Sequence, residues 1–258
     1  MTQPRFAGKH VLITGASSGI GQATSARFVA EGAKVFGLAR STEGLEETKS
    51  MCDNPDMFNY ASCDVGDEAS ITAAVKAGAE FLDGKINVVA NVAGLTVKTP
   101  IAGYDSEVAR TLMDVNFHGP MRVIAEALPH MVEGVGSSII NISSTSATQA
   151  MPELTAYGAS KAALVTATMG LAVELAPKRI RAVSLSPSGV KTKMMWDIWE
   201  QVKDYDGDWY GRLLHLWGQE ESGEAAELAA FICFAASDDA VYWNAADLRI
   251  DGGARASL

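Results

Sequence analysis

The chain has 258 residues, a formal net charge of -10 at neutral pH and 48% hydrophobic residues. This length suits one large domain or two small ones, and the hydrophobic content is sufficient for a sizeable core. The negative charge and the lack of a dense Lys/Arg cluster argue against nucleic acid or an anionic membrane as a partner.

Other features of the composition narrow the class of protein further. No apolar run approaches the roughly 20 residues that span a bilayer, and Met1–Lys9 lacks the apolar stretch of a secretory signal, so we expect a cytoplasmic protein. The cysteines Cys52, Cys63 and Cys233 are odd in number and widely spaced, which predicts reduced thiols. The four histidines show no metal-ligand spacing, so we expect no catalytic metal.

The first elements predicted along the chain form a βαβ unit. The apolar run His10–Thr14 stops at Gly15, as a buried strand entering a turn does. A helix is predicted over Ile20–Glu31, closed by Gly32, and a second buried strand over Val35–Ala39. The two strands are expected to be parallel, with a right-handed crossover.

The same alternation continues towards the C-terminus. The further predicted elements are a strand near Phe58–Ser62, a helix around Ile71–Leu82, a strand at Asn87–Ala90, a long helix at Ser106–His130, a strand at Ser138–Ile142, a helix at Tyr157–Ala176, a strand at Ala182–Leu185, a helix at Ala225–Ala236 and a strand at Asp247–Ile250. This pattern predicts one α/β domain over residues 1–258, a Rossmann-like doubly wound parallel sheet of about seven strands.

The segment Lys193–Gln219 breaks the alternation with Met, Trp and Tyr residues among scattered charges. We interpret it as a lid over the carboxyl ends of the strands, where ligands bind in open α/β sheets. The candidate substrate contacts are Met194, Met195, Trp196 and Trp199, which would wall a pocket for an apolar and fairly bulky molecule. The alternative is that these side chains pack on the body of the protein or in a subunit interface.

A glycine-rich turn joins the first strand to the first helix. Glycines at such a turn let backbone N–H groups approach a pyrophosphate, and the helix N-terminus favours its negative charge. The candidate cofactor-binding residues here are Gly15, Ser17, Ser18, Gly19, Ile20 and Gly21. A tight turn without a ligand is the alternative for this motif taken alone, and the flanking strand and helix argue against it.

The chain resembles the classical short-chain dehydrogenase/reductase family over nearly its whole length. The matching segments are the glycine pattern Thr14–Gly21, Cys63-Asp64-Val65, Asn91-Val92-Ala93-Gly94, Asn116, Ser144, Tyr157, Lys161, Pro187-Ser188-Gly189-Val190-Lys191-Thr192 and Asp251-Gly252-Gly253. The resemblance implies a nicotinamide-dependent enzyme that interconverts a ketone and a secondary alcohol.

The resemblance also assigns roles to the matching residues. It implies a catalytic tetrad of Asn116, Ser144, Tyr157 and Lys161, in which the asparagine kinks its helix and holds a water linked to the lysine. The cofactor contacts it implies are Asp64 and Val65 at the adenine, Asn91, Ala93 and Gly94, Tyr157 and Lys161, and Pro187, Gly189, Val190 and Thr192 on the nicotinamide side.

Two positions depart from the family pattern. Val92 replaces the second Asn of Asn-Asn-Ala-Gly, which we expect to loosen a hydrogen bond at the strand end. Ser188 separates Pro187 from Gly189 and is expected to reshape the turn beside the nicotinamide. Neither change removes a catalytic group.

The chemistry of the tetrad can also be argued from residue spacing. Tyr157 and Lys161 lie four apart at the start of a helix and so share one face. An ammonium beside a phenol favours the phenolate, so we expect the tyrosine pKa to fall from about 10 towards the working pH, where general acid–base catalysis is efficient. Ser144, just past a strand end, is placed to donate a hydrogen bond to the substrate oxygen.

The residues after the second predicted strand bear on the choice of cofactor. Ala39 stands where a carboxylate would bind the ribose hydroxyls of NAD, and Arg40 follows it. We therefore expect NADP(H) to be preferred over NAD(H), with Ser17 and Ser41 adding hydrogen bonds to the 2'-phosphate. The alternative is that Arg40 is a solvated surface charge.

Two further expectations concern the whole protein. The helix predicted at Tyr157–Ala176 is apolar or small nearly all round, which predicts a homo-oligomer, a tetramer in preference to a dimer. The competing function is a catalytically silent NADP-binding regulator, against which the intact tetrad argues. An extended epimerase and an enoyl reductase fit less well, because their glycine or Tyr–Lys spacings differ.

Overall fold

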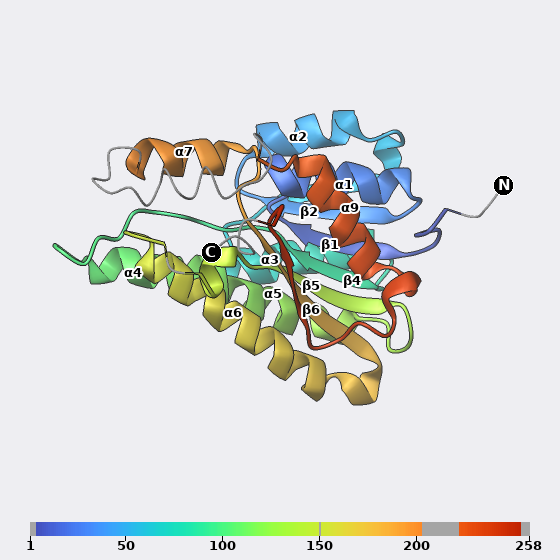
Figure 1. The fold of residues 1–258 in the computed structure, drawn as a ribbon. Helices are drawn as coiled ribbons and strands as arrows, with labels where there is room; N and C mark the ends of the chain where they lie inside the picture. The colour runs from blue at the N-terminus through green and yellow to red at the C-terminus, as the bar shows by residue number, and fades with distance from the viewer. Residues whose placement is uncertain (1–3, 150, 203–221, 254–258) are drawn as a thin grey trace.

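Seven parallel strands form the centre of the molecule. The computed structural model describes residues 4–149, 151–202 and 222–253. The strands lie in the order β3-β2-β1-β4-β5-β6-β7, all parallel (Figure 1). Their bounds are β1 His10–Thr14, β2 Lys34–Ala39, β3 Phe58–Ser62, β4 Val88–Asn91, β5 Ser137–Ile142, β6 Ile180–Pro187 and β7 Asp247–Ile250. This is the predicted doubly wound sheet, and its strand order reverses between β1 and β4, where such folds bind ligands.

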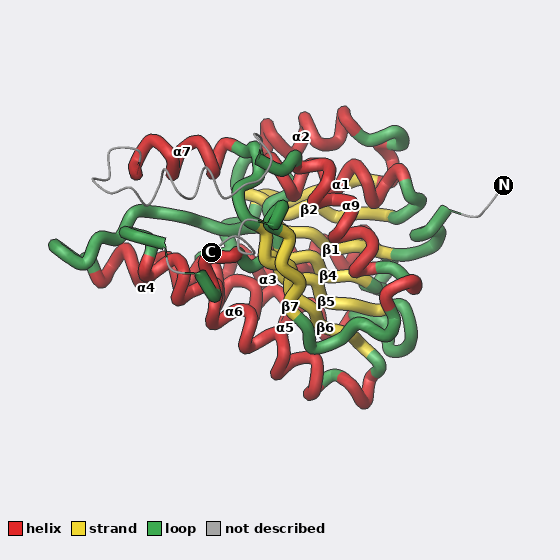
Figure 2. The backbone as a smooth tube through the Cα atoms, in the orientation of Figure 1, coloured by secondary structure: helices red, strands yellow, loops and turns green. Residues whose placement is uncertain are grey.

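Helices cover both faces of the sheet (Figure 2). One face carries α1 (Gly19–Ala30), α2 (Thr42–Met51) and α9 (Ala225–Ala236), and the other carries α3 (Glu68–Phe81), α5 (Gly119–Ala127) and α6 (Thr155–Glu174). The remaining described helices are α4 (Ser106–Met113), α7 (Lys193–Val202), a π turn at Asp114–His118 and short 3-10 turns at Pro55–Met57, Leu128–His130, Thr145–Ala147, Ala176–Lys178 and Asp238–Ala240.

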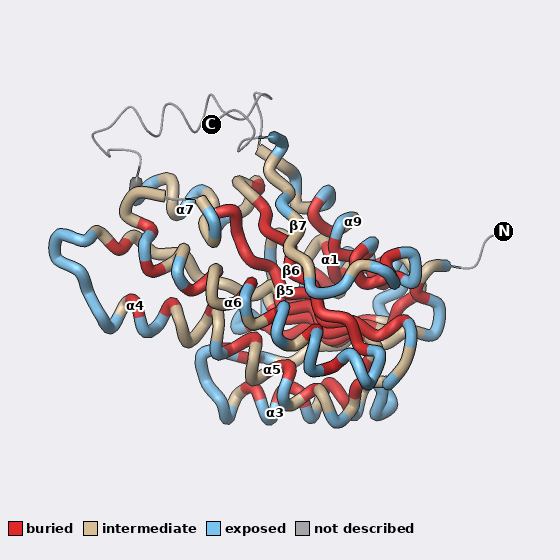
Figure 3. Tube along the Cα trace, turned by 60° about the horizontal axis from the view of Figure 1, so that its bottom comes forward, coloured by how far each residue is buried: buried red, intermediate tan, exposed pale blue. Residues whose placement is uncertain are grey.

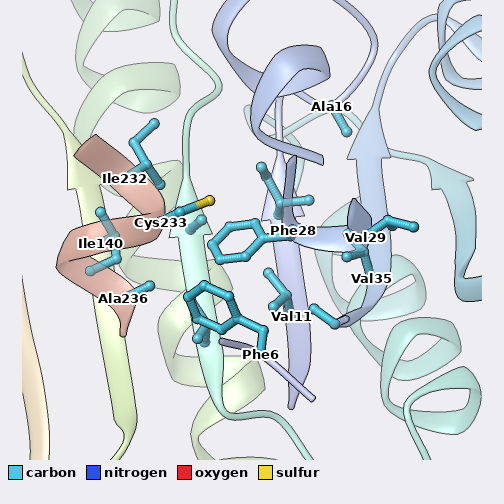
Figure 4. Packing of buried hydrophobic residues seen from close by; sticks show 14 of the residues in the cluster. Phe6, Val11, Ala16, Phe28, Val29, Val35, Ile140, Ile232, Cys233 and Ala236 are labelled. Atoms are coloured by element: carbon cyan, nitrogen blue, oxygen red, sulfur yellow. The ribbon is translucent and has the colours of Figure 1, made fainter. Parts of the chain in front are cut away.

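The sheet is buried on both faces, which is why its central strands are continuous apolar runs. Alternate side chains of β1 enter different cores: Val11 and Ile13 pack in the cluster with Phe28 of α1, whereas Leu12 belongs to the cluster on the opposite face. Figure 4 shows the first of these clusters, with Phe6 and Phe28 in edge-to-face contact at 4.9 Å between ring centroids. In Figure 3 the buried residues concentrate in the central strands, and the outer sides of the helices are exposed.

Three helical regions differ from the sequence-based prediction. Helix α2 was not predicted, because only Leu45 and Thr48 of its ten residues are buried and no apolar period results. The long helix expected at Ser106–His130 is divided by the π turn around Asn116. Residues 193–202 of the expected lid form the helix α7, and the remainder of the lid lies outside the described residues.

The remaining composition-based expectations concern thiols, metals and membranes. Cys52, Cys63 and Cys233 are buried free thiols, as expected. Within residues 4–149, 151–202 and 222–253, no cluster of three or more His, Cys, Asp or Glu side chains is arranged to hold a metal ion. Over the same ranges, none of the helices has the length and apolar character required to cross a membrane.

Candidate active site

A cavity of about 790 Å³ opens at the carboxyl ends of the strands. The loops after β1, β2, β3, β4, β5 and β6 and the helices α6 and α7 all contribute to its wall. The predicted site residues that line it are Gly15, Ser17, Ser18, Gly19, Ile20, Gly21, Arg40, Ser41, Asp64, Val65, Ala93, Gly94, Ser144, Tyr157, Lys161, Pro187, Gly189, Val190, Thr192, Met194, Met195, Trp196 and Trp199. Asn91 and Asn116 do not line it.

The glycine-rich turn is built so that only glycine fits at its key positions. Gly15 has φ +72°, and a Cβ there would lie 2.7 Å from the backbone nitrogen of Ala93. A Cβ on Gly21 would overlap the carbonyl oxygen of Gly15. Helix α1 begins at Gly19, and its N-cap residue Ser18 makes no side-chain hydrogen bond to the first turn. The first amides of α1 therefore remain available to an anion such as a pyrophosphate.

The segments that follow β2 and β3 in the cavity wall suit an adenosine group. Asp64 lies after β3, and its carboxylate accepts a hydrogen bond from the Gly66 N–H at 2.9 Å. Ser41 caps α2 by accepting from the Gly44 N–H at 3.1 Å. Arg40 is exposed, and its guanidinium forms no ion pair with any residue in the described part of the chain. These residues and the glycine turn fit a nicotinamide dinucleotide.

Three members of the predicted tetrad meet in the wall of the cavity. Ser144 follows β5, and Tyr157 and Lys161 lie on the first turns of α6. Lys161 is 4% exposed, and its ammonium donates to the carbonyl oxygen of Ile142 at 2.9 Å and lies 6.0 Å from the centre of the Tyr157 ring. The fold thus brings together two hydroxyls that can hold a substrate oxygen, those of Ser144 and Tyr157, and places the Lys161 ammonium next to them.

Burial changes the acid–base properties of this group in a way that the sequence did not predict. Desolvation raises the pKa of Tyr157, and hydrogen bonding with Ser144 opposes this by lowering it. Desolvation also lowers the pKa of Lys161 to about 8. The expectation that the tyrosine pKa falls is therefore wrong for this structure, because desolvation by burial is the largest effect on Tyr157.

Asn116 lies behind the cavity wall and holds the segment after β4. Its Oδ1 accepts from the Leu95 N–H at 2.8 Å, and its Nδ2 donates to the Leu95 carbonyl at 2.8 Å and to Ser160 Oγ at 3.0 Å. A Cβ on Gly94 would lie 3.3 Å from both Asn116 Oδ1 and Lys161 Nζ. The asparagine thus sits opposite the lysine, in a π turn of the kind often found at functional sites.

Asn91 is also outside the cavity. Its Nδ2 donates to Asn141 Oδ1 on the neighbouring strand at 2.9 Å, so its side chain joins strands within the sheet. The hydrogen bonds at the end of β4 run from the backbone N–H groups of Val92 and Ala93 to Thr14 Oγ1, both at 3.1 Å. These hydrogen bonds use backbone donors and do not involve the side chain at position 92.

The loop on the nicotinamide side is tied to both neighbouring segments. The Ser188 N–H donates to the Ile250 carbonyl at 3.0 Å, which extends the pairing of β6 with β7 by one residue. The Gly223 N–H donates to the Gly189 carbonyl at 3.1 Å, and the Lys191 N–H donates to the Gly223 carbonyl at 2.8 Å. The extra serine is thus accommodated within a hydrogen-bonded strand end.

Helix α7 closes one side of the cavity. Thr192 Oγ1 accepts from the Met195 N–H at 3.3 Å at the start of the helix, and Gln201 Oε1 accepts from the Lys98 N–H at 3.2 Å. Trp196 lines the cavity but is 56% exposed. The lining residues that the sequence analysis missed include Leu95, Thr96, Gln149, Met151 and Leu154. These residues lie just after β4 or just before Tyr157, and this closeness in sequence to predicted site residues could have identified them as part of the cavity wall.

Comparisons with known proteins agree with this geometry. A family model for short chain dehydrogenase matches residues 9–203. The chain is 34% identical to 2-(R)-hydroxypropyl-CoM dehydrogenase of Xanthobacter autotrophicus over 93% of this chain and 96% of that protein. It is 32% identical to levodione reductase of Leifsonia aquatica over 98% of this chain and 96% of that protein.

The fold of the chain is also similar to that of a solved structure. The crystal structure of a levodione reductase superposes with a TM-score of 0.89 at 30% identity, covering 98% of this chain and 100% of that one. The 2-dehydro-3-deoxy-L-rhamnonate dehydrogenase (NAD(+)) of a Sphingomonas species is 30% identical over 96% of both proteins. The chain therefore belongs to the short-chain dehydrogenase family and is an oxidoreductase acting on CH–OH groups.

Proposed function

We propose that the protein interconverts a ketone and a secondary alcohol on an apolar substrate, using NADP(H) and the Tyr157 hydroxyl as proton donor and acceptor. The observation that carries this proposal is the shared cavity, which joins Ser144, Tyr157 and Lys161 to the glycine turn at the N-terminus of α1. When bound, the nicotinamide supplies or accepts the hydride.

The side chains of the site have complementary tasks in this reaction. Ser144 and Tyr157 hold the substrate oxygen by hydrogen bonds that strengthen as negative charge develops on it. A tyrosine whose pKa is raised by burial carries its proton at neutral pH and suits the reductive direction, in which it protonates the new alkoxide. Lys161 lies behind the tyrosine and provides the adjacent positive charge when it is protonated.

Arg40 and Ala39 support the preference for NADP(H). The exposed guanidinium at the edge of the cavity suits a 2'-phosphate, and Ala39 offers no carboxylate to the ribose hydroxyls. The related rhamnonate dehydrogenase is named as an NAD(+) enzyme, so the family itself does not decide between the two cofactors.

Helix α7 supports an apolar substrate. Its residues Met194, Met195, Trp196 and Trp199 line the cavity directly after the loop on the nicotinamide side. Segments in this place that close over a substrate exclude water from the reacting atoms. We infer that α7 is the described part of such a lid. Tyr205, Trp209, Tyr210 and Trp217 lie outside the described residues.

The proposal extends to assembly and location. The exposed apolar residues Met169 and Val173 on α6 favour a homo-oligomer, and we propose a tetramer. The three unpaired cysteines fit a reducing compartment such as the cytoplasm.

The function is tested by following NADPH oxidation with a panel of cyclic and acyclic ketones. Wild-type protein should reduce several of them, and Tyr157→Phe should lower kcat by about 10²–10⁴-fold while retaining NADPH binding, because only the proton-exchanging hydroxyl has gone. A silent NADP-binding regulator would bind NADPH and reduce none of the panel. Substantial turnover by Tyr157→Phe would refute the role given to the tyrosine.

A further inference from the structure

Among the described polar side chains that line the cavity and are not used by the proposed reaction, Gln149 has an unsatisfied amide group. Gln149 lies in the segment between β5 and α6 and lines the cavity. Its backbone N–H donates to the Thr145 carbonyl at 2.9 Å, which places it in the same turn as Ser144. Apolar side chains dominate the wall around it: Leu95, Met151, Leu154, Met194, Trp196 and Trp199.

The amide nitrogen of Gln149 is buried and has no hydrogen-bond partner among the residues that the structure describes. A buried donor without an acceptor is unfavourable, and most buried side-chain donors in folded proteins are paired. Gln149 lines the cavity, so a ligand bound there can supply the acceptor that this amide lacks. If no ligand supplied the acceptor, replacing Gln149 with an apolar residue of the same size would stabilise the fold.

We propose that Gln149 is a specificity-determining residue that donates a hydrogen bond from Nε2 to a second oxygen of the substrate, close to the reacting carbonyl. This inference rests on the proposed function and makes it more specific. It assigns the substrate to the class of ketones that carry a second carbonyl or hydroxyl oxygen on an otherwise apolar body.

The charges around the cavity favour a neutral oxygen over a carboxylate at this subsite. A carboxylate is usually bound by Arg or Lys, whereas Gln149 is a neutral donor. Lys193 also lines the cavity, but its ammonium is paired with Asp197 at 2.6 Å. Lys161 is buried behind Tyr157 and donates to the Ile142 carbonyl.

The test uses pairs of substrates that differ only by a hydroxyl against a methyl group. Cyclohexanones substituted with either group at ring position 2, 3 or 4 are compared by kcat/KM in wild-type protein, Gln149→Leu and Gln149→Glu. At one ring position we expect the wild type to prefer the hydroxyl compound, and both variants should lose about tenfold on it, because each lacks the amide donor. The methyl partner should be unaffected by Gln149→Leu.

Met151→Leu is the matched control, since Met151 lines the same cavity but offers no donor. It should change the two members of each pair by the same factor. Thermal unfolding of all variants checks that the fold is retained. Calorimetric binding of each pair to NADPH-loaded Tyr157→Phe protein, with and without Gln149→Leu, repeats the comparison with turnover suppressed.

The outcomes separate the two proposals. If wild-type protein reduces both members of every pair, and Gln149→Leu shifts them equally in turnover and binding, the Gln149 assignment is overturned while the proposed function stands. If no ketone is reduced but the hydroxyl compound binds in a Gln149-dependent way, the reaction is wrong and the subsite is right. Equal binding of both members with and without Gln149→Leu also overturns the subsite.

Discussion

At the level of single residues, burial decides which groups of the candidate site carry charge. Lys161 is enclosed by the protein, and its pKa falls from the ordinary value of 10.5 to about 8. The folded protein therefore binds fewer protons than the unfolded chain between about pH 8 and 10.5. The contribution of Lys161 to stability is greatest above the unfolded pKa and is lost as the pH falls through the folded pKa.

Lys161→Met is predicted to stabilise the protein at pH 7 while abolishing turnover. Removing the ammonium relieves a desolvation penalty of about 3 kcal/mol, whereas losing its hydrogen bond to Ile142 destabilises the variant by about 1 kcal/mol. We therefore expect the free energy of unfolding to rise by about 2 kcal/mol. Urea unfolding of both proteins measures it. The gain should shrink as the pH rises from 8 towards 10.5, and a gain independent of pH would contradict the assigned pKa.

Arg40→Ala is predicted to change cofactor preference without changing catalysis. Removing the guanidinium should lower kcat/KM for NADPH by about tenfold, as expected for one charge-assisted hydrogen bond at an exposed site, and leave the value for NADH unchanged. Steady-state kinetics with each cofactor measures the ratio. Lys49→Ala is the control, because it removes the same charge from α2 at a residue that does not line the cavity. An NADH-favouring wild type would overturn the NADP assignment.

At the level of elements, the helix that carries Tyr157 is capped by a distant loop. The N-cap residue of α6, Leu154, provides no side-chain hydrogen bond. Instead Thr99, in the loop after β4, accepts from the Ala156 N–H at 3.3 Å through its hydroxyl and donates its own N–H to the Glu153 carbonyl at 2.6 Å. The first turn of α6, and with it the tyrosine, is thus positioned by a segment 57 residues away in the sequence.

Thr99→Val is predicted to lower kcat more than it raises KM, because the tyrosine loses its positioning while the cavity wall keeps its shape. Loss of the cap should also reduce the free energy of unfolding by about 1 kcal/mol. Thr99→Ser keeps the hydroxyl and should behave like the wild type in both measurements. If the valine and serine variants are alike, the cap has no positioning role.

The lid assignment is tested by Trp196→Ala and Trp199→Ala. Each variant should lower kcat/KM for a bulky apolar ketone by about tenfold or more, because buried apolar contact is lost, and should leave butanone nearly unaffected. Tyr242→Ala is a control at an exposed aromatic residue away from the cavity. Equal effects on the two ketones would indicate that these tryptophans pack for structure and not around substrate.

At the level of the whole molecule, helices α6 and α9 each expose a pair of apolar side chains. Met169 and Val173 on α6 are 41% and 73% exposed, and Phe231 and Phe234 on α9 are 41% and 42% exposed. The two helices cover opposite faces of the sheet. Two separate self-complementary contacts are the arrangement that builds a tetramer from dimers.

We therefore expect light scattering at micromolar concentration to report a tetramer. Val173→Glu and Phe231→Glu should each reduce it to a smaller species, because a buried unpaired charge at either contact is unfavourable. Glu133→Gln, a change at an exposed residue outside both helices, should leave the mass unchanged. A monomeric wild type would contradict the prediction.

The sequence by itself determined the architecture and the identity of most of the site. Buried strands such as His10–Thr14 are recognisable because a parallel sheet is covered on both faces and so requires continuous apolar runs. The glycines of the first turn and the Tyr157–Lys161 spacing are local patterns, readable without any long-range contact.

Only the tertiary structure decided the properties that depend on residues distant in the chain. Asn91 was expected at the cofactor, yet its side chain bonds to Asn141 because the strand register directs it there, and the contact of Asn116 with the Leu95 backbone depends on helix packing. The protonation of Tyr157 followed from its depth of burial and not from its spacing to a lysine. Burial and pairing are sums over neighbours that the fold brings together, so no local pattern encodes them.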